Sequence, residues 1–281
     1  MASSLELPSS FYCTQPIDFS KPLDTDSLKE KSVIVTGGAN GIGLASARAF
    51  AEAGAYVTIL DINEENGQRA ASELGERGLH VQFVKTDTTS FSSQVAGFKA
   101  ALSFSPSKTV DIVLANAGVA GSNLKAWLEN AAKSTSDDPE PPSTLCLDVN
   151  LTGVYYTAHL SFFYFKHNLR KEDTAGPVSK QLIFVSSLAG YIGLSNVGEY
   201  GASKFGVRGL WKAVRHSGAL LGPSVRYRSN LIAPTFIRTN MTAGIDSALE
   251  KRGIKLGTVD DVVAGVMRAA CDEEVSGRAI A

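Results

Sequence analysis

A regular alternation starts at Ser32: short apolar runs of strand length are separated by longer segments with helical periodicity, and the pattern continues to the end of the chain. Strands joined by crossover helices run parallel, because only an antiparallel pair can be connected by a tight turn. The pattern therefore predicts an α/β fold in which helices cover both faces of one parallel sheet.

We predict seven strands, at Ser32–Thr36, Tyr56–Asp61, Val81–Lys85, Val110–Ala115, Gln181–Ser186, Val225–Ile232 and Arg278–Ala281. The helical segments between them lie near Gly43–Ala53, Glu64–Arg77, Ser92–Ser103, Thr144–Lys171, Glu199–Leu221 and Val259–Cys271. One doubly wound domain over residues 32–281 accounts for all of them, although length alone would allow two domains.

Three segments fall outside the alternation. Residues 1–31 are rich in Ser, Pro and Asp and are expected to be a loosely ordered lead-in, with a partner-binding arm as the alternative. Residues 120–143 hold prolines and a Ser/Asp run, so we expect an exposed insertion loop, or else a substrate-binding or partner-binding element. Residues 235–257 follow the sixth strand at the ligand-binding edge of such a sheet and are expected to form a substrate lid.

The chain stops in or just after the last strand, which suggests a short or truncated C-terminus.

Composition excludes several partners. The 281 residues carry a formal net charge of −1, which gives no broad positive surface for nucleic acid. There is no apolar run of the roughly 20 residues that cross a bilayer and no signal-peptide pattern, so we expect a cytoplasmic protein without membrane contact. Cys13, Cys146 and Cys271 lie far apart and no His stands at ligand spacing from them, so neither a disulfide framework nor a metal site is expected.

A glycine-rich turn follows the first strand. The run Thr36-Gly37-Gly38-Ala39-Asn40-Gly41-Ile42-Gly43 leads from that strand directly into a helix. This order places backbone N–H groups and the positive end of a helix dipole against a pyrophosphate, as in the Rossmann dinucleotide fold. Glycine is also common in ordinary turns, so the context of the motif matters.

An acidic residue supplies part of that context. Asp61 ends the second strand, where an acid binds the adenosine ribose hydroxyls and repels a 2′-phosphate. Asn40, Ile62 and Asn63 offer no cation to such a phosphate, so NAD is favoured over NADP. A surface carboxylate that caps a helix is the alternative reading of Asp61.

Tyr200 and Lys204 lie four residues apart on a predicted helix and hence on one face of it. A phenol with a pKa near 10 is a weak base at neutral pH, and a nearby cation lowers that pKa. Such pairs are common on helix surfaces, so the neighbouring sequence blocks decide whether this pair is catalytic. Ser186-Ser187 ends the fifth strand, and Asn116-Ala117-Gly118 follows the fourth.

Taken in order, these blocks resemble the short-chain dehydrogenase/reductase family. Its T-G-x-x-x-G-x-G, N-A-G, N-x-x-G, S-S and Y-x-x-x-K motifs stand at Thr36, Asn116, Asn150, Ser186 and Tyr200, and the resemblance covers about residues 32–281. Within the family, the chain looks closest to the hydroxyprostaglandin dehydrogenase-like and the fungal secondary-metabolite dehydrogenases. The resemblance also implies a homodimer or homotetramer, because the long helices of this family pair across two-fold axes.

The resemblance implies a role for each catalytic position. Tyr200 would be the acid/base, Lys204 would lower its pKa and hold the nicotinamide ribose, and Asn150 would bind a water in a proton relay. Ser187, which competes with Ser186, would contact the substrate oxygen. The remaining cofactor contacts implied are Gly37, Asn40, Gly41, Ile42, Gly43, Asp61, Ile62, Asp87, Thr88, Asn116, Ala117, Gly118, Pro234, Ile237 and Thr239.

The substrate side is expected to be apolar, with contacts from Val119, Tyr191 and Phe236 beside Ser187 and Tyr200. One position departs from the family pattern: Thr235 follows Pro234 where glycine is usual, so the backbone before Ile237 and Thr239 has less freedom.

Three functions follow from these observations. The leading hypothesis is an NAD-dependent dehydrogenase that oxidises a secondary alcohol of a lipophilic polyketide, terpenoid or steroid-like molecule. The second is a carbonyl reductase that uses NADH or NADPH. The third is a non-catalytic NAD(H)-binding sensor or scaffold, which would not need Asn150, Ser187, Tyr200 and Lys204 together.

Overall fold

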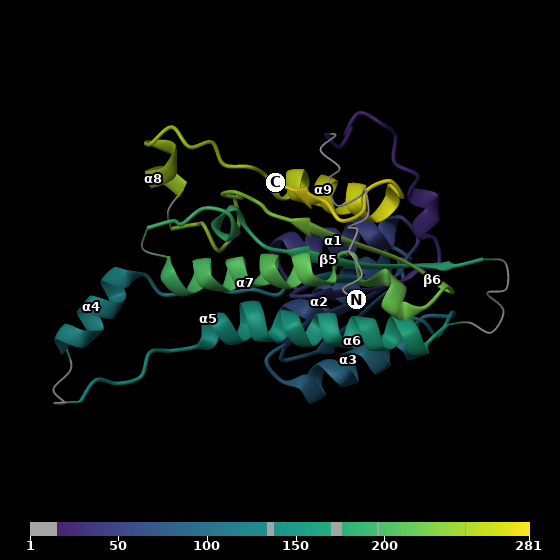
Figure 1. Cartoon of the computed structure of the whole chain (residues 1–281), viewed down its shortest axis with the longest axis horizontal. Helices are drawn as coiled ribbons and strands as arrows, with labels where there is room; N and C mark the ends of the chain where they lie inside the picture. The colour runs from purple at the N-terminus through teal and green to yellow at the C-terminus, as the bar shows by residue number, and fades with distance from the viewer. Residues whose placement is uncertain (1–15, 134–137, 170–175, 196, 245) are drawn as a thin grey trace, which may run out of the picture.

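The computed structural model describes residues 16–133, 138–169, 176–195, 197–244 and 246–281 (Figure 1). In these residues seven parallel strands form one sheet in the order β3-β2-β1-β4-β5-β6-β7. The strands are β1 (Ser32–Thr36), β2 (Tyr56–Asp61), β3 (Val81–Lys85), β4 (Ile112–Ala115), β5 (Val178–Val185), β6 (Val225–Ile232) and β7 (Ala279–Ile280). The predicted doubly wound α/β fold is confirmed, and β1, β2, β3 and β6 have the predicted bounds.

Two layers of helices cover the sheet. On one face lie α1 (Gly41–Glu52), α2 (Glu64–Glu76) and α9 (Val259–Cys271); on the other lie α3 (Phe91–Phe104), α6 (Val154–His167) and α7 (Gly198–Val214). Side chains of the strands alternate between the two apolar clusters: Val33 and Val35 pack with α1, and Ile34 between them packs with α3. Both faces are therefore buried, which explains why the strands are apolar throughout.

The predicted helix Thr144–Lys171 is divided in the structure. It consists of α5 (Leu145–Leu147), a π-helical stretch (Asp148–Gly153) and α6, and its last two predicted residues lie outside the described residues. The sequence period does not reveal the wider π turn, because apolar residues continue on both sides of it. The predicted helix Glu199–Leu221 likewise ends at Val214 as α7, and a 3-10 helix follows at Ser217–Leu221.

The insertion 120–143 was expected to be a loop, and its first half is instead helical. The helix α4 (Leu124–Lys133) starts where the Asn123 side chain accepts a hydrogen bond from the backbone N–H of Ala126 at 2.8 Å. The prolines that suggested a loop all come after α4, and residues 134–137 lie outside the described residues. In the expected lid, the short helix α8 (Asp246–Glu250) is formed.

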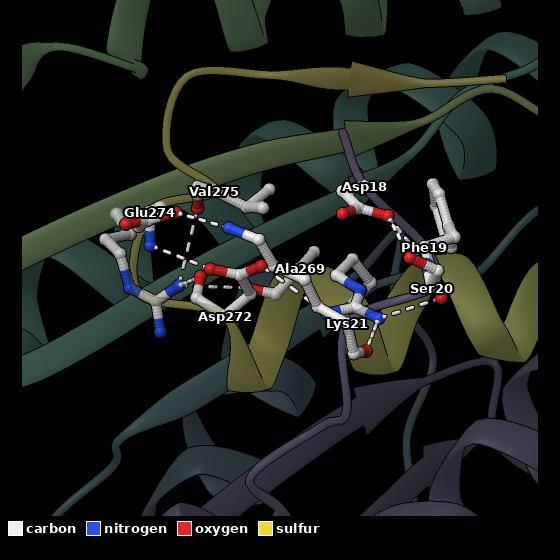
Figure 2. Close-up of polar contacts among 10 residues, drawn as sticks. Asp18, Phe19, Ser20, Lys21, Ala269, Asp272, Glu274 and Val275 are labelled. Carbon is white, nitrogen blue, oxygen red and sulfur yellow. Dashed lines mark hydrogen bonds and ion pairs between the residues drawn. The ribbon is translucent and has the colours of Figure 1, made fainter. Parts of the chain in front are cut away.

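The described half of the lead-in is fastened to the domain rather than loosely held. The Arg268 guanidinium on α9 donates to the carbonyl oxygens of Phe19, at 3.2 Å, and Lys21. Lys21 also pairs with Glu274 at 3.2 Å, and Figure 2 shows this stretch lying along α9. Leu28 is only 1% exposed and belongs to the core. Residues 1–15, where a partner-binding arm was considered, lie outside the described residues.

A buried ion pair joins three strands at the edge of the sheet where they begin. Lys180 Nζ lies 2.8 Å from Asp111 Oδ1, and both side chains are shielded from solvent. The other carboxylate oxygen of Asp111 accepts a hydrogen bond from the backbone N–H of Ser32 at 2.9 Å. Residues just before or within β1, β4 and β5 are thereby tied together.

Across the described ranges, no helix is long and apolar enough to cross a membrane. The same residues contain no group of three or more His, Cys, Asp and Glu side chains that could hold a metal ion.

Candidate active site

The strand order changes direction at the centre of the sheet, between β1 and β4. The chain proceeds outward from β1 to β2 and β3, then returns to place β4 on the other side of β1. The glycine-rich turn follows β1, and Asn116-Ala117-Gly118 follows β4, so both lie at this switch point. Open α/β sheets bind ligands at the carboxyl ends of strands at such a point.

Two glycines of the turn allow its backbone to pack closely. A Cβ on Gly43 would lie 2.0 Å from the carbonyl oxygen of Gly37, and one on Gly37, whose φ is +66°, would lie 2.7 Å from Ala117 Cα. Gly41 also has a positive φ, of +52°, but its Cβ would meet nothing nearer than a Thr239 methyl group at 3.9 Å. The middle glycine therefore presents an open backbone surface beside Thr239.

The start of α1 faces this open surface without a side-chain cap. Asn40 occupies the N-cap position, but its side chain makes no capping hydrogen bond; instead its Oδ1 accepts one from Asn66 Nδ2 at 3.1 Å. Exposed N–H groups and the positive end of a helix dipole suit an anion. The turn at Gly41 thus fits the pyrophosphate of a dinucleotide, which the sequence predicted.

Asp61 is held rigidly beside the turn. Its Oδ2 accepts a hydrogen bond from the backbone N–H of Ala39 at 3.0 Å, and its Oδ1 accepts one from Asn63 at 2.9 Å. The N-cap of α2 is Asn63, whose side chain accepts from Asn66 N at 3.0 Å. The helix-cap reading of Asp61 is therefore wrong, and each carboxylate oxygen keeps a lone pair for a ribose hydroxyl.

Other predicted cofactor contacts have structural partners. Asn116 Nδ2 donates to the carbonyl oxygens of Thr36 and Gly37, both at 3.0 Å, so this side chain holds the turn in shape. Asp87 Oδ1 accepts from the Thr89 hydroxyl at 2.7 Å. The Ile237 side chain is buried in the core, which leaves only its backbone for contact with a ligand.

The remaining predicted cofactor positions line the same edge. Ala117 is buried and Gly118 is half-buried after β4, Thr88 is buried after β3, and Ile62 is exposed after β2. Pro234, which follows β6, accepts a hydrogen bond from the backbone N–H of Leu188 at 2.9 Å.

Tyr200 and Lys204 occupy the first turns of α7. Lys204 Nζ lies 5.6 Å from the centre of the Tyr200 ring and donates to the carbonyl oxygen of Val185 at 3.2 Å. Burial lowers the pKa of Lys204 to about 8. Burial also raises the pKa of Tyr200, while a hydrogen bond with Ser187 opposes that rise. The expected lowering of the Tyr200 pKa by Lys204 is therefore not found in this structure, because desolvation of the phenol dominates.

The two serines after β5 have different surroundings. Ser186 is buried, and its hydroxyl donates to the carbonyl oxygen of Lys204 at 3.0 Å. Ser187 is half-buried, accepts from Ala189 N at 3.1 Å and makes the hydrogen bond with Tyr200. The geometry thus brings Ser187, and not Ser186, to the phenol.

Asn150 lies in the π-helical stretch and is fully buried. Its Oδ1 accepts from Val119 N at 2.7 Å, and its Nδ2 donates to Val119 O at 2.9 Å and Ser203 Oγ at 3.2 Å. A Cβ on Gly118 would touch both Asn150 Oδ1, at 3.3 Å, and Lys204 Nζ, at 3.5 Å. Asn150 and Lys204 therefore both lie against Gly118, and the relay through Asn150 stays a prediction.

Sequence reasoning missed two neighbours of Asn150. The Cys146 thiol lies 3.3 Å from Asn150 Nδ2, and Ser203 bridges to the carbonyl oxygen of Tyr200 at 2.7 Å. The spacing of four residues between Cys146 and Asn150 on one predicted helix was the available signal.

The expected substrate contacts have different surroundings. Val119 and Phe236 are half-buried, and Val119 is hydrogen-bonded to Asn150. The Tyr191 ring stacks on the Arg208 guanidinium, with 4.0 Å between the charge and the ring centre. Contact of these three residues with the substrate stays a prediction.

Comparison with known proteins identifies the family: the sequence matches the short chain dehydrogenases over residues 31–250. The chain belongs to the short-chain dehydrogenase family. This short-chain dehydrogenase is similar to 5'-hydroxyaverantin dehydrogenase of Dothistroma septosporum, with 40% identity over 92% of this chain and 86% of that protein. It is 41% identical to the NADP-dependent dehydrogenase M3 of Phoma sp., over 95% of this chain and 78% of the relative.

A solved structure with the same fold is that of gox2181. It aligns with a TM-score of 0.73 and 26% identity, over 91% of this short-chain dehydrogenase and 95% of that chain. The predicted likeness to fungal secondary-metabolite dehydrogenases is confirmed, and the chain is an oxidoreductase with a Rossmann fold.

Proposed function

We propose that this short-chain dehydrogenase uses NAD to oxidise a secondary alcohol on a lipophilic secondary metabolite, with Tyr200 as the acid/base. The observation that carries the proposal is the placement of a half-buried phenol and a buried ammonium on one face of α7, beside an uncapped glycine-rich turn. Polar side chains of this kind are kept out of water only at a cost, which indicates a function other than stability.

Each residue of the site has its own role in the proposed reaction. Ser187 and Tyr200 bind the substrate oxygen, and Tyr200 as the phenolate accepts the hydroxyl proton while the carbinol carbon loses a hydride. Bound NAD would supply the two-electron acceptor for the hydride. Lys204 and Asn150 both lie against Gly118, and a water held by Asn150 would take the proton onward from Lys204. Gly41, the start of α1 and Asp61 hold the dinucleotide so that proximity provides most of the rate.

The substrate class is supported by the relatives and by the apolar surroundings of the site. A relative with 40% identity is named for the oxidation of a hydroxylated metabolite, 5'-hydroxyaverantin. Val119 and Phe236 offer apolar surface next to Asn150 and Pro234. A lipophilic alcohol is therefore the substrate class that we propose for this chain.

The proposal is tested by the absorbance of NADH at 340 nm. The substrates are 5'-hydroxyaverantin, 1-(2-naphthyl)ethanol and 2-butanol, each with NAD and with NADP. Tyr200→Phe is expected to lose about a thousandfold in turnover while it still binds NADH, because it keeps the ring and removes only the hydroxyl. Unchanged turnover in Tyr200→Phe, or no NADH from any alcohol with the intact protein, contradicts the proposal. The second result would favour the non-catalytic sensor.

A second candidate is an NADPH-dependent carbonyl reductase, and a specific contact favours it. Arg69 on α2 donates to Asn66 Oδ1 at 2.6 Å, and Asn66 in turn donates to Asn40 in the glycine-rich turn. This chain of contacts brings a guanidinium near the position expected for a 2′-phosphate. The relative from Phoma sp. is named as NADP-dependent.

We also propose that the enzyme is a homo-oligomer. Tyr155 and Phe163 on α6 and Phe205 on α7 are large apolar residues that are about half exposed. Their burial against a second copy would shield this surface from water. Light scattering of the purified protein tests this, and a monomer mass across the micromolar range contradicts it.

A further inference from the structure

The helix α4 is attached to the catalytic helix by a polar latch formed by Glu199, Ser122 and Trp127. Glu199 Oε1 accepts hydrogen bonds from the backbone N–H of Ser122 and from its hydroxyl, the latter at 2.8 Å. The same hydroxyl accepts a hydrogen bond from Trp127 Nε1 at 2.6 Å. Glu199 directly precedes Tyr200, so the latch fixes α4 to the turn of α7 that carries the phenol.

The apolar stripe of α4 faces α7 but is not buried by it. Leu124, Trp127 and Leu128 lie on one side of the helix and are 40%, 42% and 73% exposed. A Cβ on Gly198 would lie 3.4 Å from the Trp127 indole, so the ring rests near the backbone two residues before Tyr200. Figure 1 shows α4 at the end of the molecule where α7 begins, clear of both helical layers.

The side of α4 that flanks this stripe is polar. Lys125 and Glu129 form an exposed ion pair at 3.4 Å on that side. The orientation of the helix is therefore set: polar residues face water, and apolar residues face the beginning of α7 without a protein partner that covers them within the described residues.

We propose that α4 is the wall of the active site that binds the apolar body of the substrate, with Trp127 as a specificity-determining contact and Glu199 as a positioning residue. This inference rests on the proposed function and adds the element that selects the substrate. The insertion starts at the catalytic centre, since Gly118 lies against Lys204 and Val119 is bonded to Asn150. A bulky alcohol bound at Tyr200 extends toward this stripe, whereas a small alcohol does not reach it.

Steady-state kinetics with a large and a small alcohol test the proposal. Trp127→Ala is expected to raise KM for 1-(2-naphthyl)ethanol by about tenfold or more, with little change in kcat and in KM for 2-butanol. Glu199→Ala is expected to show the same pattern. Glu199→Gln retains an acceptor oxygen for Ser122 and is expected to restore most of the wild-type KM. Lys125→Ala, on the polar flank of α4, is the matched control.

A second readout follows the latch without any substrate. The chain has two tryptophans, and Trp211 is only 2% exposed, so quenching of fluorescence by acrylamide reports mainly on Trp127. Ser122→Ala and Glu199→Ala are expected to increase this quenching. The part of the fluorescence that acrylamide does not quench comes from buried Trp211, and its persistence shows that the protein remains folded.

The results for α4 and for the proposed function are distinguishable. If the wild type oxidises 1-(2-naphthyl)ethanol and Trp127→Ala leaves its KM unchanged, or raises KM for both alcohols equally, the inference about α4 is wrong and the proposed function stands. If the wild type oxidises no alcohol, the proposed function fails. An unchanged acrylamide quenching in Glu199→Ala would show that the latch does not hold α4.

Discussion

The buried Lys204 should make the folded protein less stable at neutral pH than a variant without the charge. A lysine pKa of 10.5 in the unfolded chain falls to about 8 in the folded one. At about 1.4 kcal/mol per pKa unit, the charge costs about 3.3 kcal/mol at pH 7 and about 0.8 kcal/mol at pH 10. The cost falls because the folded state binds fewer protons than the unfolded state between these pH values, so stability rises with pH.

Lys204→Met removes the charge and keeps the length of the side chain. It also removes the hydrogen bond to the carbonyl oxygen of Val185, a loss of about 1 kcal/mol. We expect the variant to be more stable than the wild type by about 2 kcal/mol at pH 7 and to match it near pH 10. The variant should nevertheless be inactive, since it lacks the ammonium beside Tyr200.

Urea unfolding at pH 7, 8, 9 and 10 measures this difference, with Trp211 fluorescence as the signal and a fixed protein concentration. Lys212→Met is the matched control, because Lys212 is an exposed lysine on the same helix. A stability difference for Lys204→Met that does not change with pH, or a variant less stable than the wild type at pH 7, would refute the reasoning.

Three further predictions concern the turn, the ion pair and pH. Gly43→Ala should weaken NADH binding in a fluorescence titration by about a hundredfold or prevent folding, because its Cβ would lie 2.0 Å from a backbone oxygen. Gly75→Ala is the control: its Cβ would lie in open space, so this variant should bind NADH normally. Lys180→Met should lower the free energy of urea unfolding by about 3–5 kcal/mol because it leaves Asp111 buried and unpaired, and a loss below about 1 kcal/mol contradicts this. Alcohol oxidation should accelerate from pH 7 to about 8, because burial raises the pKa of the Tyr200 base, and should slow above that, because Lys204 loses its charge as pH passes its pKa of about 8. A flat pH–rate profile contradicts this.

The fold was predictable because its signals are local. Each strand is an apolar run with its own boundaries, and the glycine-rich turn has a backbone geometry that few other residues can adopt. Only Ser187 follows a strand, β5, whereas Asn150, Tyr200 and Lys204 lie on helices. Their proximity was therefore implied by the family resemblance and not by a local pattern. These four side chains come together in the structure.

The remaining features depend on contacts that sequence position does not encode. Tyr191 lies four residues after Ser187, yet the 3-10 helix Leu188–Gly190 turns the chain and places its ring on Arg208. The helix α4 was obscured by the prolines that follow it. The latch to Glu199 joins residues that are 77 positions apart, so no local pattern reveals it.

The pKa of Tyr200 shows why a motif alone is insufficient. The sequence places an ammonium one turn away, which favours the phenolate, but burial of the phenol acts in the opposite direction and is the larger effect here. The balance between charge and desolvation is a property of the packed site, and only the structure gives it.

The central claim is that the Asp61 site binds NAD(H) in preference to the phosphorylated cofactor, and side-by-side calorimetric titrations with NADH and NADPH test it most directly. The wild type should bind NADH at least about tenfold more tightly than NADPH, and Asp61→Asn should narrow that difference by removing the negative charge beside the 2′ position. Tighter binding of NADPH by the wild type, with the preference reduced in Arg69→Ala, would contradict the account and favour the reductase.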